Sequence, residues 1–238
     1  MMAVNTQAST LAERVASVRQ RMAEAAQRAG RKVAEVTLVA VSKTHPAATI
    51  QAAMAEGLSV FGENRVQEAE QKIPVLGRDA AKWHLIGHLQ SNKARRAVEL
   101  FDVIHSLDSA ALARRLDRIC EELQRETLPV LLQVDLGHEA TKSGADEKSL
   151  REVVDAVQEC PRLRLLGLMT LPPFFDEAEQ ARPFFRRLRE LRDGLAAAGG
   201  FAHGPGELSM GMTHDFEIAI EEGATMVRVG TAIFGARD

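Results

Sequence analysis

The chain has 238 residues, a length that one α/β barrel can occupy as a single domain. Its 30 Lys and Arg against 33 Asp and Glu give a net charge of -3 without a long run of like charge, which argues against a nucleic-acid tail or a basic membrane anchor. The composition also argues against a membrane span and a signal peptide. Cys120 and Cys160 form no Cys-x-x-Cys pattern, so neither a disulfide framework nor a zinc site is expected, and a reduced cytoplasmic compartment fits.

The first predicted element is a helix over residues 8–30. Thr10-Leu11-Ala12-Glu13 matches a capping box, in which a hydroxyl and a carboxylate satisfy free backbone donors at the start of a helix. Val15, Val18 and Met22 follow at helical spacing, and Gly30 marks the stop.

From residue 36 the chain alternates short apolar segments with helical ones. The first strand, 36–41, is followed by a turn and by Pro46, which suits the first position of a helix. Eight strands are predicted, at residues 36–41, 58–61, 83–86, 102–105, 130–135, 165–169, 207–210 and 225–229. Such alternation predicts a parallel sheet, and eight strands favour one domain, 1–238, with a (β/α)8 TIM barrel over residues 36–235. An open doubly wound sheet is the alternative.

The reactive face of a parallel barrel lies at the C-terminal ends of its strands, and Lys43 follows the first strand. A partly desolvated lysine loses proton affinity, because burial disfavours the charged form. Its neutral amine can then form a Schiff base with an aldehyde. The ordinary alternative is a lysine that reaches water.

The loops after the last two strands are rich in glycine. Ser209-Met210-Gly211-Met212-Thr213 leads into a helix that we expect to begin near Thr213, and Gly230-Thr231 follows the final strand. A glycine turn that opens a helix offers free N–H groups and a favourable dipole to an anion. Barrel enzymes often bind phosphate between these two loops, so we predict a phosphate site; two ordinary glycine turns are the alternative.

Arg228 interrupts the apolar last strand. Strand alternation puts Met226, Arg228 and Gly230 on one face. If that face points into the barrel, a permanent cation points toward the ligand. Pairing of Arg228 with a carboxylate of a neighbouring strand is an equally weighted alternative.

Seven segments, in order from the first strand to the C-terminus, resemble the pyridoxal phosphate homeostasis protein family, the YggS/PROSC group. They are Ala40-Val41-Ser42-Lys43-Thr44, Phe61-Gly62-Glu63-Asn64-Arg65-Val66-Gln67-Glu68, Trp83-His84-Leu85-Ile86-Gly87-His88-Leu89-Gln90, Lys142-Ser143-Gly144, Gly167-Leu168-Met169, Leu208-Ser209-Met210-Gly211-Met212 and Val227-Arg228-Val229-Gly230-Thr231-Ala232-Ile233-Phe234-Gly235. Two positions depart from the family pattern: Thr213 stands where Ser is frequent, and His88 varies in the family.

The resemblance implies a barrel like the N-terminal domain of alanine racemase, with pyridoxal 5'-phosphate (PLP) held as an internal aldimine on Lys43. It places the phosphate at Ser209, Gly230 and Thr231, with nearby backbone from Gly211 and Met212. It puts Arg228 near the pyridine nitrogen. The remaining residues that it assigns to the cofactor pocket are Asn64, His84 and Met169.

Arg228 also bears on catalysis. A guanidinium is always protonated, so it would discourage protonation of the pyridine nitrogen and make the ring a poorer electron sink. Related racemases use a tyrosine of a second domain as the opposing base, and this chain contains no Tyr. We therefore expect a PLP-binding protein of intracellular PLP homeostasis without substantial turnover. A weak racemase that uses Lys43 as its one base is the alternative.

Two other enzyme hypotheses fit less well. A Schiff-base aldolase would carry its lysine on a later strand. A metal enzyme would need clustered ligands, but the 7 His are scattered and Gly87 marks a turn between His84 and His88. The expected partners are PLP and PLP-dependent apoenzymes, with neither nucleic acid nor membrane. A monomer is expected, with a dimer as the alternative. The arginines of residues 186–192 are expected to form a solvated helix face.

Overall fold

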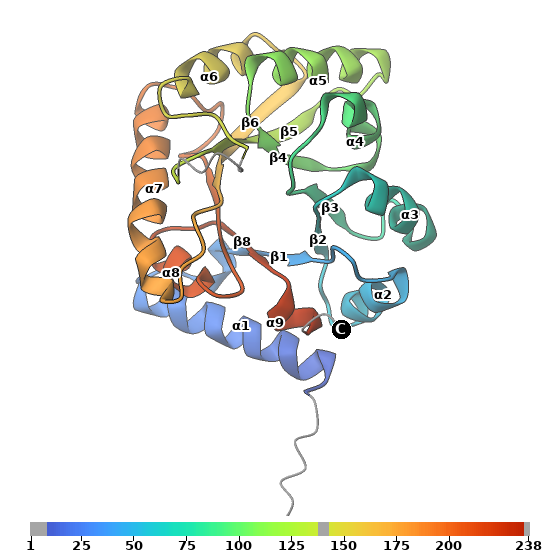
Figure 1. Cartoon of the computed structure of the whole chain (residues 1–238), viewed down its shortest axis with the longest axis vertical. Helices are drawn as coiled ribbons and strands as arrows, with labels where there is room; N and C mark the ends of the chain where they lie inside the picture. The colour runs from blue at the N-terminus through green and yellow to red at the C-terminus, as the bar shows by residue number, and fades with distance from the viewer. Residues whose placement is uncertain (1–8, 138–142, 236–238) are drawn as a thin grey trace, which may run out of the picture.

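The computed structural model describes residues 9–137 and 143–235, and its eight parallel strands close into a barrel (Figure 1). Each strand pairs with the next one along the chain, and β8 pairs with β1 through Thr37–Ala40 and Met226–Val229. The strands are β1 Thr37–Val41, β2 Val60–Glu63, β3 Lys82–Leu85, β4 Val103–Leu107, β5 Leu128–Val134, β6 Leu163–Thr170, β7 Glu207–Met212 and β8 Met226–Val229. The prediction of a closed barrel is confirmed, and the open-sheet alternative is wrong.

Helices surround the strands (Figure 1) and bury their apolar faces against them. They are α1 Leu11–Arg28, α2 Ala47–Ala55, α3 Val66–Leu76, α4 Ala94–Leu100, α5 Ala110–Glu122, α6 Leu150–Gln158, α7 Arg182–Ala197, α8 Phe216–Glu221 and α9 Thr231–Phe234, with 3-10 turns at η1 Val33–Glu35, η2 Ser91–Lys93 and η3 Ala178–Ala181. Large side chains such as Phe61, Trp83 and Phe185 fill the core and are fully buried. Within the described part of the chain, no helix combines the length and the apolar composition needed to cross a membrane.

The helix that precedes the barrel begins at Leu11 and ends at Arg28, so it is shorter than predicted at both described ends. The predicted capping box is present: Glu13 N donates to Thr10 Oγ1 at 3.2 Å, and Thr10 N donates to Glu13 Oε2 at 2.8 Å. α1 lies alongside α8 and α9 (Figure 1). Arg14 Nε donates to the Ile233 carbonyl at 2.7 Å, so α1 holds the last helix of the barrel directly.

Three boundaries differ from the predictions, each for a local reason. Pro46 caps α2 instead of opening it, because its ψ of 160° is extended. The helix expected near Thr213 begins at Phe216, because Asp215 N donates to the Met212 carbonyl at 3.1 Å and forms a turn first. The loop expected after β8 contains the short helix α9.

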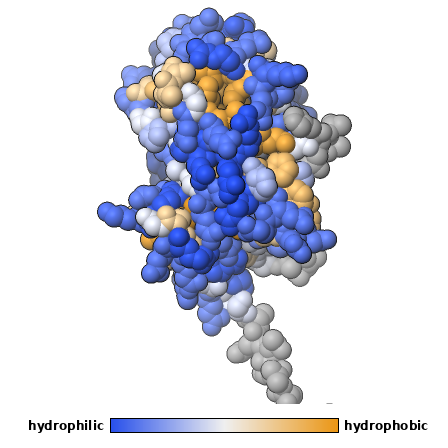
Figure 2. All heavy atoms as spheres, turned by 90° about the vertical axis from the view of Figure 1, so that its left-hand side faces the viewer, coloured by the Kyte–Doolittle hydropathy of each residue, from blue (hydrophilic) through white to orange (hydrophobic). Residues whose placement is uncertain are grey.

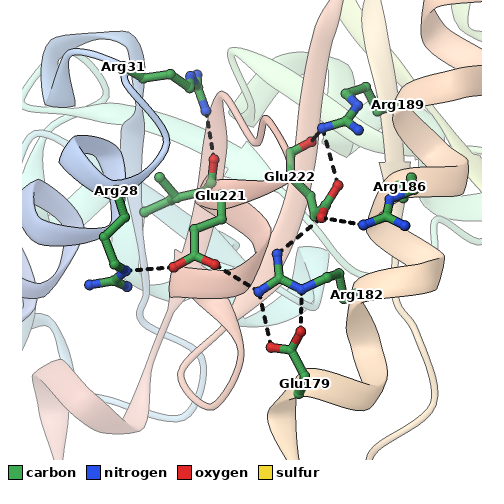
Figure 3. A network of polar contacts seen from close by, with 9 residues as sticks. Arg28, Arg31, Glu179, Arg182, Arg186, Arg189, Glu221 and Glu222 are labelled. Atoms are coloured by element: carbon green, nitrogen blue, oxygen red, sulfur yellow. Dashed lines mark hydrogen bonds and ion pairs between the residues drawn. The ribbon is translucent and has the colours of Figure 1, made fainter.

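The arginines of α7 form a network with acidic side chains at the end of α8 (Figure 3). The Glu222 carboxylate, 5% exposed as a residue, lies 3.0 Å from Arg182, 3.1 Å from Arg186 and 3.1 Å from Arg189. Glu221 joins Arg182 to α1 through Arg28, at 2.8 and 2.7 Å. The network ties α1, α7 and α8 together.

The side of the molecule that α7 forms is largely hydrophilic (Figure 2). Arg186 and Arg187 are exposed, whereas Arg189 and Arg192 are partly buried. The prediction of a solvated helix face is confirmed for the outer arginines. The others reach inward, because Glu222 and the Gly206 carbonyl accept hydrogen bonds from Arg189 and Arg192.

Glu222→Gln is expected to lower the free energy of unfolding by about 1–3 kcal/mol at pH 7, since it weakens hydrogen bonds between charged groups. Burial alone would raise the pKa of Glu222, but hydrogen bonds from Arg186 and Arg182 bring that pKa below its ordinary value of 4.5. The unfolded chain therefore takes up the proton first, and the stabilisation, complete above pH 4.5, is lost as the pH falls through the lowered pKa.

Urea unfolding of both proteins between pH 3 and pH 7 (about the range over which a carboxylate titrates) measures this difference. Glu190→Gln is the matched control, because Glu190 also pairs with an arginine of α7, Arg187, but its side chain is 54% exposed. This substitution should change the free energy of unfolding by less than about 0.5 kcal/mol. A Glu222→Gln penalty that is the same at acid and neutral pH would contradict the assignment.

Candidate functional site

A chain of hydrogen bonds crosses the interior of the barrel. Arg228 of β8 donates through Nη1 to Ser209 Oγ at 2.6 Å and through Nη2 to the Thr170 carbonyl at 2.8 Å. Ser209 Oγ is also hydrogen-bonded to His105 Nδ1 at 2.9 Å. His105 Nε2 in turn lies 2.9 Å from His84 Nδ1. The chain therefore joins β8, β7, β4 and β3 side chain to side chain.

These contacts decide between the two alternatives for Arg228. Side chains of β4 and β7, which are not neighbours in the sheet, can meet only inside the barrel. Arg228 therefore points inward, where it donates hydrogen bonds to a hydroxyl and a carbonyl. The Asp215 carboxylate, in the loop after β7, interacts with it electrostatically. Met169, which pairs with Ser209 along the sheet, packs with Val103 and Leu131 in a separate apolar cluster of the same strands.

The charges of this chain follow from burial. Burial lowers the pKa of Arg228 to about 10, so the guanidinium stays charged at neutral pH. Burial lowers the pKa of His84 to about 4. The pKa of His105 is lowered well below its usual value, first by burial and then by His84 and Arg228. The interior thus presents one fixed cation beside two neutral imidazoles.

Lys43 lies in a tight turn at the end of β1. Ser42 N donates to the Gly62 carbonyl at 3.0 Å, which extends the strand pairing, and His45 N donates to the Ser42 carbonyl at 3.1 Å, which closes the turn. Thr44 has a φ of 67°, a conformation that is unfavourable for a β-branched residue and costs on the order of 1–3 kcal/mol. Lys43 itself is partly buried.

The turn that carries Lys43 packs against the loop after β8. The His45 ring stacks on the Phe234 ring with centroids 4.8 Å apart. A Cβ added to Gly230 would lie 3.4 Å from Val41 Cβ. The predicted lysine site and the predicted Gly230-Thr231 site are therefore adjacent.

The loops after β7 and β8 are also joined to each other. Gly230 N donates to Thr213 Oγ1 at 3.2 Å, and Met212 N donates to Asp215 Oδ1 at 2.6 Å. Both amides therefore have acceptors within the protein, whereas Thr231 N opens α9 and has no acceptor within that helix. Gly211, at φ 89°, lets α8 approach closely, since a Cβ there would lie 2.5 Å from Ala219 Cβ.

Two other predicted site residues lie apart from these loops. Ser209 is fully buried within the barrel, where its hydroxyl binds Arg228 and His105. Asn64 lines a cavity of about 640 Å³ between the loops after β2 and β3, together with Arg65, Gln67, Gln71, His88, Gln90 and Lys93 among others. Lys142 of one matching segment lies outside the described residues.

Three residues of the site, His105, Thr170 and Asp215, were not among the predicted site residues. His105 stands two residues after Val103, so the alternation argument applied to Arg228 would have found it. Thr170 contributes a carbonyl, which no side-chain pattern reveals. Within the described residues, no group of three or more His, Cys, Asp or Glu could hold a metal ion, and Cys120 and Cys160 are free and buried.

Comparison with known proteins extends over almost the whole chain. Residues 14–238 match the family model described as alanine racemase, N-terminal domain. The pyridoxal phosphate homeostasis protein of Aquifex aeolicus is 43% identical, over 94% of this chain and 97% of that protein. The Escherichia coli K12 protein of the same name is 46% identical, over 96% and 97%.

Solved structures agree with these matches. PipY of Synechococcus elongatus, in a structure described as having PLP bound, is 42% identical with a TM-score of 0.82, covering 95% of this chain and 100% of PipY. Alanine racemase of Corynebacterium glutamicum has a TM-score of 0.65 at 22% identity, with 61% of that chain covered, which is a likeness of fold alone. This chain belongs to the alanine racemase N-terminal domain family, and within it to the group of pyridoxal phosphate homeostasis proteins.

Proposed function

We propose that this protein binds PLP covalently through Lys43 and takes part in intracellular PLP homeostasis without substantial catalytic turnover. The observation that carries the proposal is the packing of the Lys43 turn on the loop after β8, through His45 and Phe234 at 4.8 Å. It brings the turn that carries Lys43 beside the Gly230-Thr231 loop, which supports a phosphate site next to the lysine. The aldehyde of PLP supplies the electrophile that condenses with a primary amine.

The residues of this chain fit the cofactor in three ways. Lys43 is partly buried, in the turn that packs against the loop after β8. Gly230 and Thr231 open α9 beside the Thr213 hydroxyl, where N–H groups of a first helical turn can bind an anion. Arg228 supplies a buried charge that stays protonated. The relative PipY has been solved both with and without PLP, which supports reversible loading here.

The interior chain argues against rapid racemisation. Arg228 cannot accept a proton, and burial keeps the pKa of His84 near 4, so neither group favours protonation of the cofactor ring. The chain has no Tyr to act as a second base. We expect the protein to hold PLP and to pass it to PLP-dependent apoenzymes.

The absorption spectrum of the purified protein with PLP tests the proposal. We expect a visible band that borohydride removes, because borohydride reduces a Schiff base to a stable amine, and peptide mapping should then find the modified residue at Lys43. Modification of another lysine would overturn the assignment. Racemisation of alanine at about 10 s⁻¹, the median for enzymes, would overturn the carrier function.

A further inference from the structure

Three charged side chains surround the turn that carries Lys43. Lys72 Nζ of α3 donates to Glu63 Oε1 at 2.9 Å and to the Ser42 carbonyl at 2.9 Å. It also lies 3.3 Å from Glu68 Oε2. Glu63 is 0% and Lys72 8% exposed. Removing these charges from water is costly. We therefore expect the buried cluster to fix the geometry of the backbone around it.

The cluster holds the backbone on both sides of Lys43. On one side, Ser42 Oγ donates to Glu63 Oε1 at 2.7 Å, while the Ser42 carbonyl accepts from Lys72. On the other side, Thr44 N donates to Glu68 Oε2 at 2.7 Å. These contacts of the cluster with the turn therefore fall on the two residues next to Lys43.

The contact at Thr44 compensates for an unfavourable backbone. Thr44 adopts a positive φ of 67°, and its N–H points at the Glu68 carboxylate. Burial opposes ionisation of Glu68, but the Thr44 N–H and Lys72 outweigh it and lower the pKa of that carboxyl. Glu68 is thus a charged acceptor at neutral pH, and hydrogen bonds to charged acceptors are the stronger ones.

We infer that Glu63, Glu68 and Lys72 are positioning residues that fix the Lys43 amine for reaction with the aldehyde of PLP, an inference that rests on the proposed function. They act through Ser42 and Thr44, the residues on either side of Lys43. Loss of one of them should weaken the covalent step while leaving the sites for the phosphate and the ring intact.

Glu68→Ala is the principal test, since Glu68 is the most exposed member, with its side chain 26% exposed. Affinities are measured for PLP and for pyridoxine 5'-phosphate, whose alcohol cannot condense with an amine. We expect the PLP affinity to fall about tenfold through loss of a hydrogen bond to a charged group. The affinity for the alcohol should change less than about twofold, which is within the usual scatter for remote substitutions.

Glu70→Ala is the matched control, because Glu70 lies on the same helix but pairs with Arg96 on the surface; both affinities should stay at the native values. Glu68→Gln keeps an oxygen acceptor for Thr44 N and should retain most of the PLP affinity. Adding Thr44→Gly to Glu68→Ala should restore part of it, because glycine adopts a positive φ without strain.

Ser42→Ala provides a second and milder test on the other side of Lys43, and it keeps the test available if Glu68→Ala fails to fold. It should also weaken PLP selectively over pyridoxine 5'-phosphate. Equal losses for both ligands, or no loss in either variant, would overturn the inference. A wild-type protein that does not bind PLP covalently would instead refute the proposed function.

Discussion

Lys43→Ala is expected to abolish covalent attachment of PLP, so that borohydride reduction leaves no pyridoxyl group on the protein. A methyl group cannot condense with an aldehyde, so the variant loses the covalent link that the proposed function assigns to Lys43. The turn itself should survive, because the hydrogen bond that closes it joins the backbone of His45 and Ser42. Residual binding of PLP through the phosphate and the ring should then be fast and reversible.

Lys82→Ala is the control for this variant. Lys82 begins β3, so it lies at the N-terminal end of the strands, opposite the end at which Lys43 lies. Its side chain is 71% exposed. Its spectrum with PLP should match that of the native protein. If borohydride fixed a pyridoxyl group to the Lys43→Ala protein, the reactive amine would belong to another residue.

Gly167→Ala should prevent stable folding of the barrel. A Cβ on Gly167 would lie 2.0 Å from the Glu207 carbonyl oxygen and 2.4 Å from its nitrogen, and both atoms belong to the backbone of the paired strand β7. Relief requires β6 and β7 to separate at the pair formed by Gly167 and Glu207. The expected loss exceeds about 4 kcal/mol, a large share of the roughly 5–15 kcal/mol that stabilises a typical domain.

Gly194→Ala tests the same chemical change at an open position. Gly194 belongs to α7, and among residues 9–137 and 143–235 no heavy atom outside that helix would lie within 4 Å of the added Cβ. Alanine is favoured over glycine in a helix by about 0.5–1 kcal/mol, so this variant should melt at or above the native temperature. Soluble yield and thermal melting compare the two variants, and similar melting would show that β6 and β7 can adjust.

The fold was largely predictable because its signals are local. Eight apolar segments, each followed by helical spacing, required only the periods of strands and helices, and the capping box at Thr10 was found at its position. The errors lie at the ends of elements, where short turns set the boundary: Asp215 forms a turn before α8, and the four residues after Gly230 coil into α9. A helix of that length has no sequence signal of its own.

The site was only partly predictable. Lys43, Arg228 and the Gly230 loop follow from the rule that strand ends carry function, and the structure brings their elements together. Ser209 was expected with the phosphate loops but binds Arg228 inside the barrel. Glu63 was noted only as part of a family motif, and Lys72 was not singled out. The ion pair between them could not be predicted, because it depends on how β2 and α3 pack.

The chain of hydrogen-bonded side chains through the middle of the barrel restricts which substitutions can be accepted there. Many barrels fill this space with layers of branched apolar side chains, which exchange freely when total volume is kept. Here the guanidinium, the hydroxyl and two imidazoles constrain one another by direction. Substitutions at these positions must therefore preserve donors and acceptors in order, and drift in this lineage should concentrate in the shell between strands and helices.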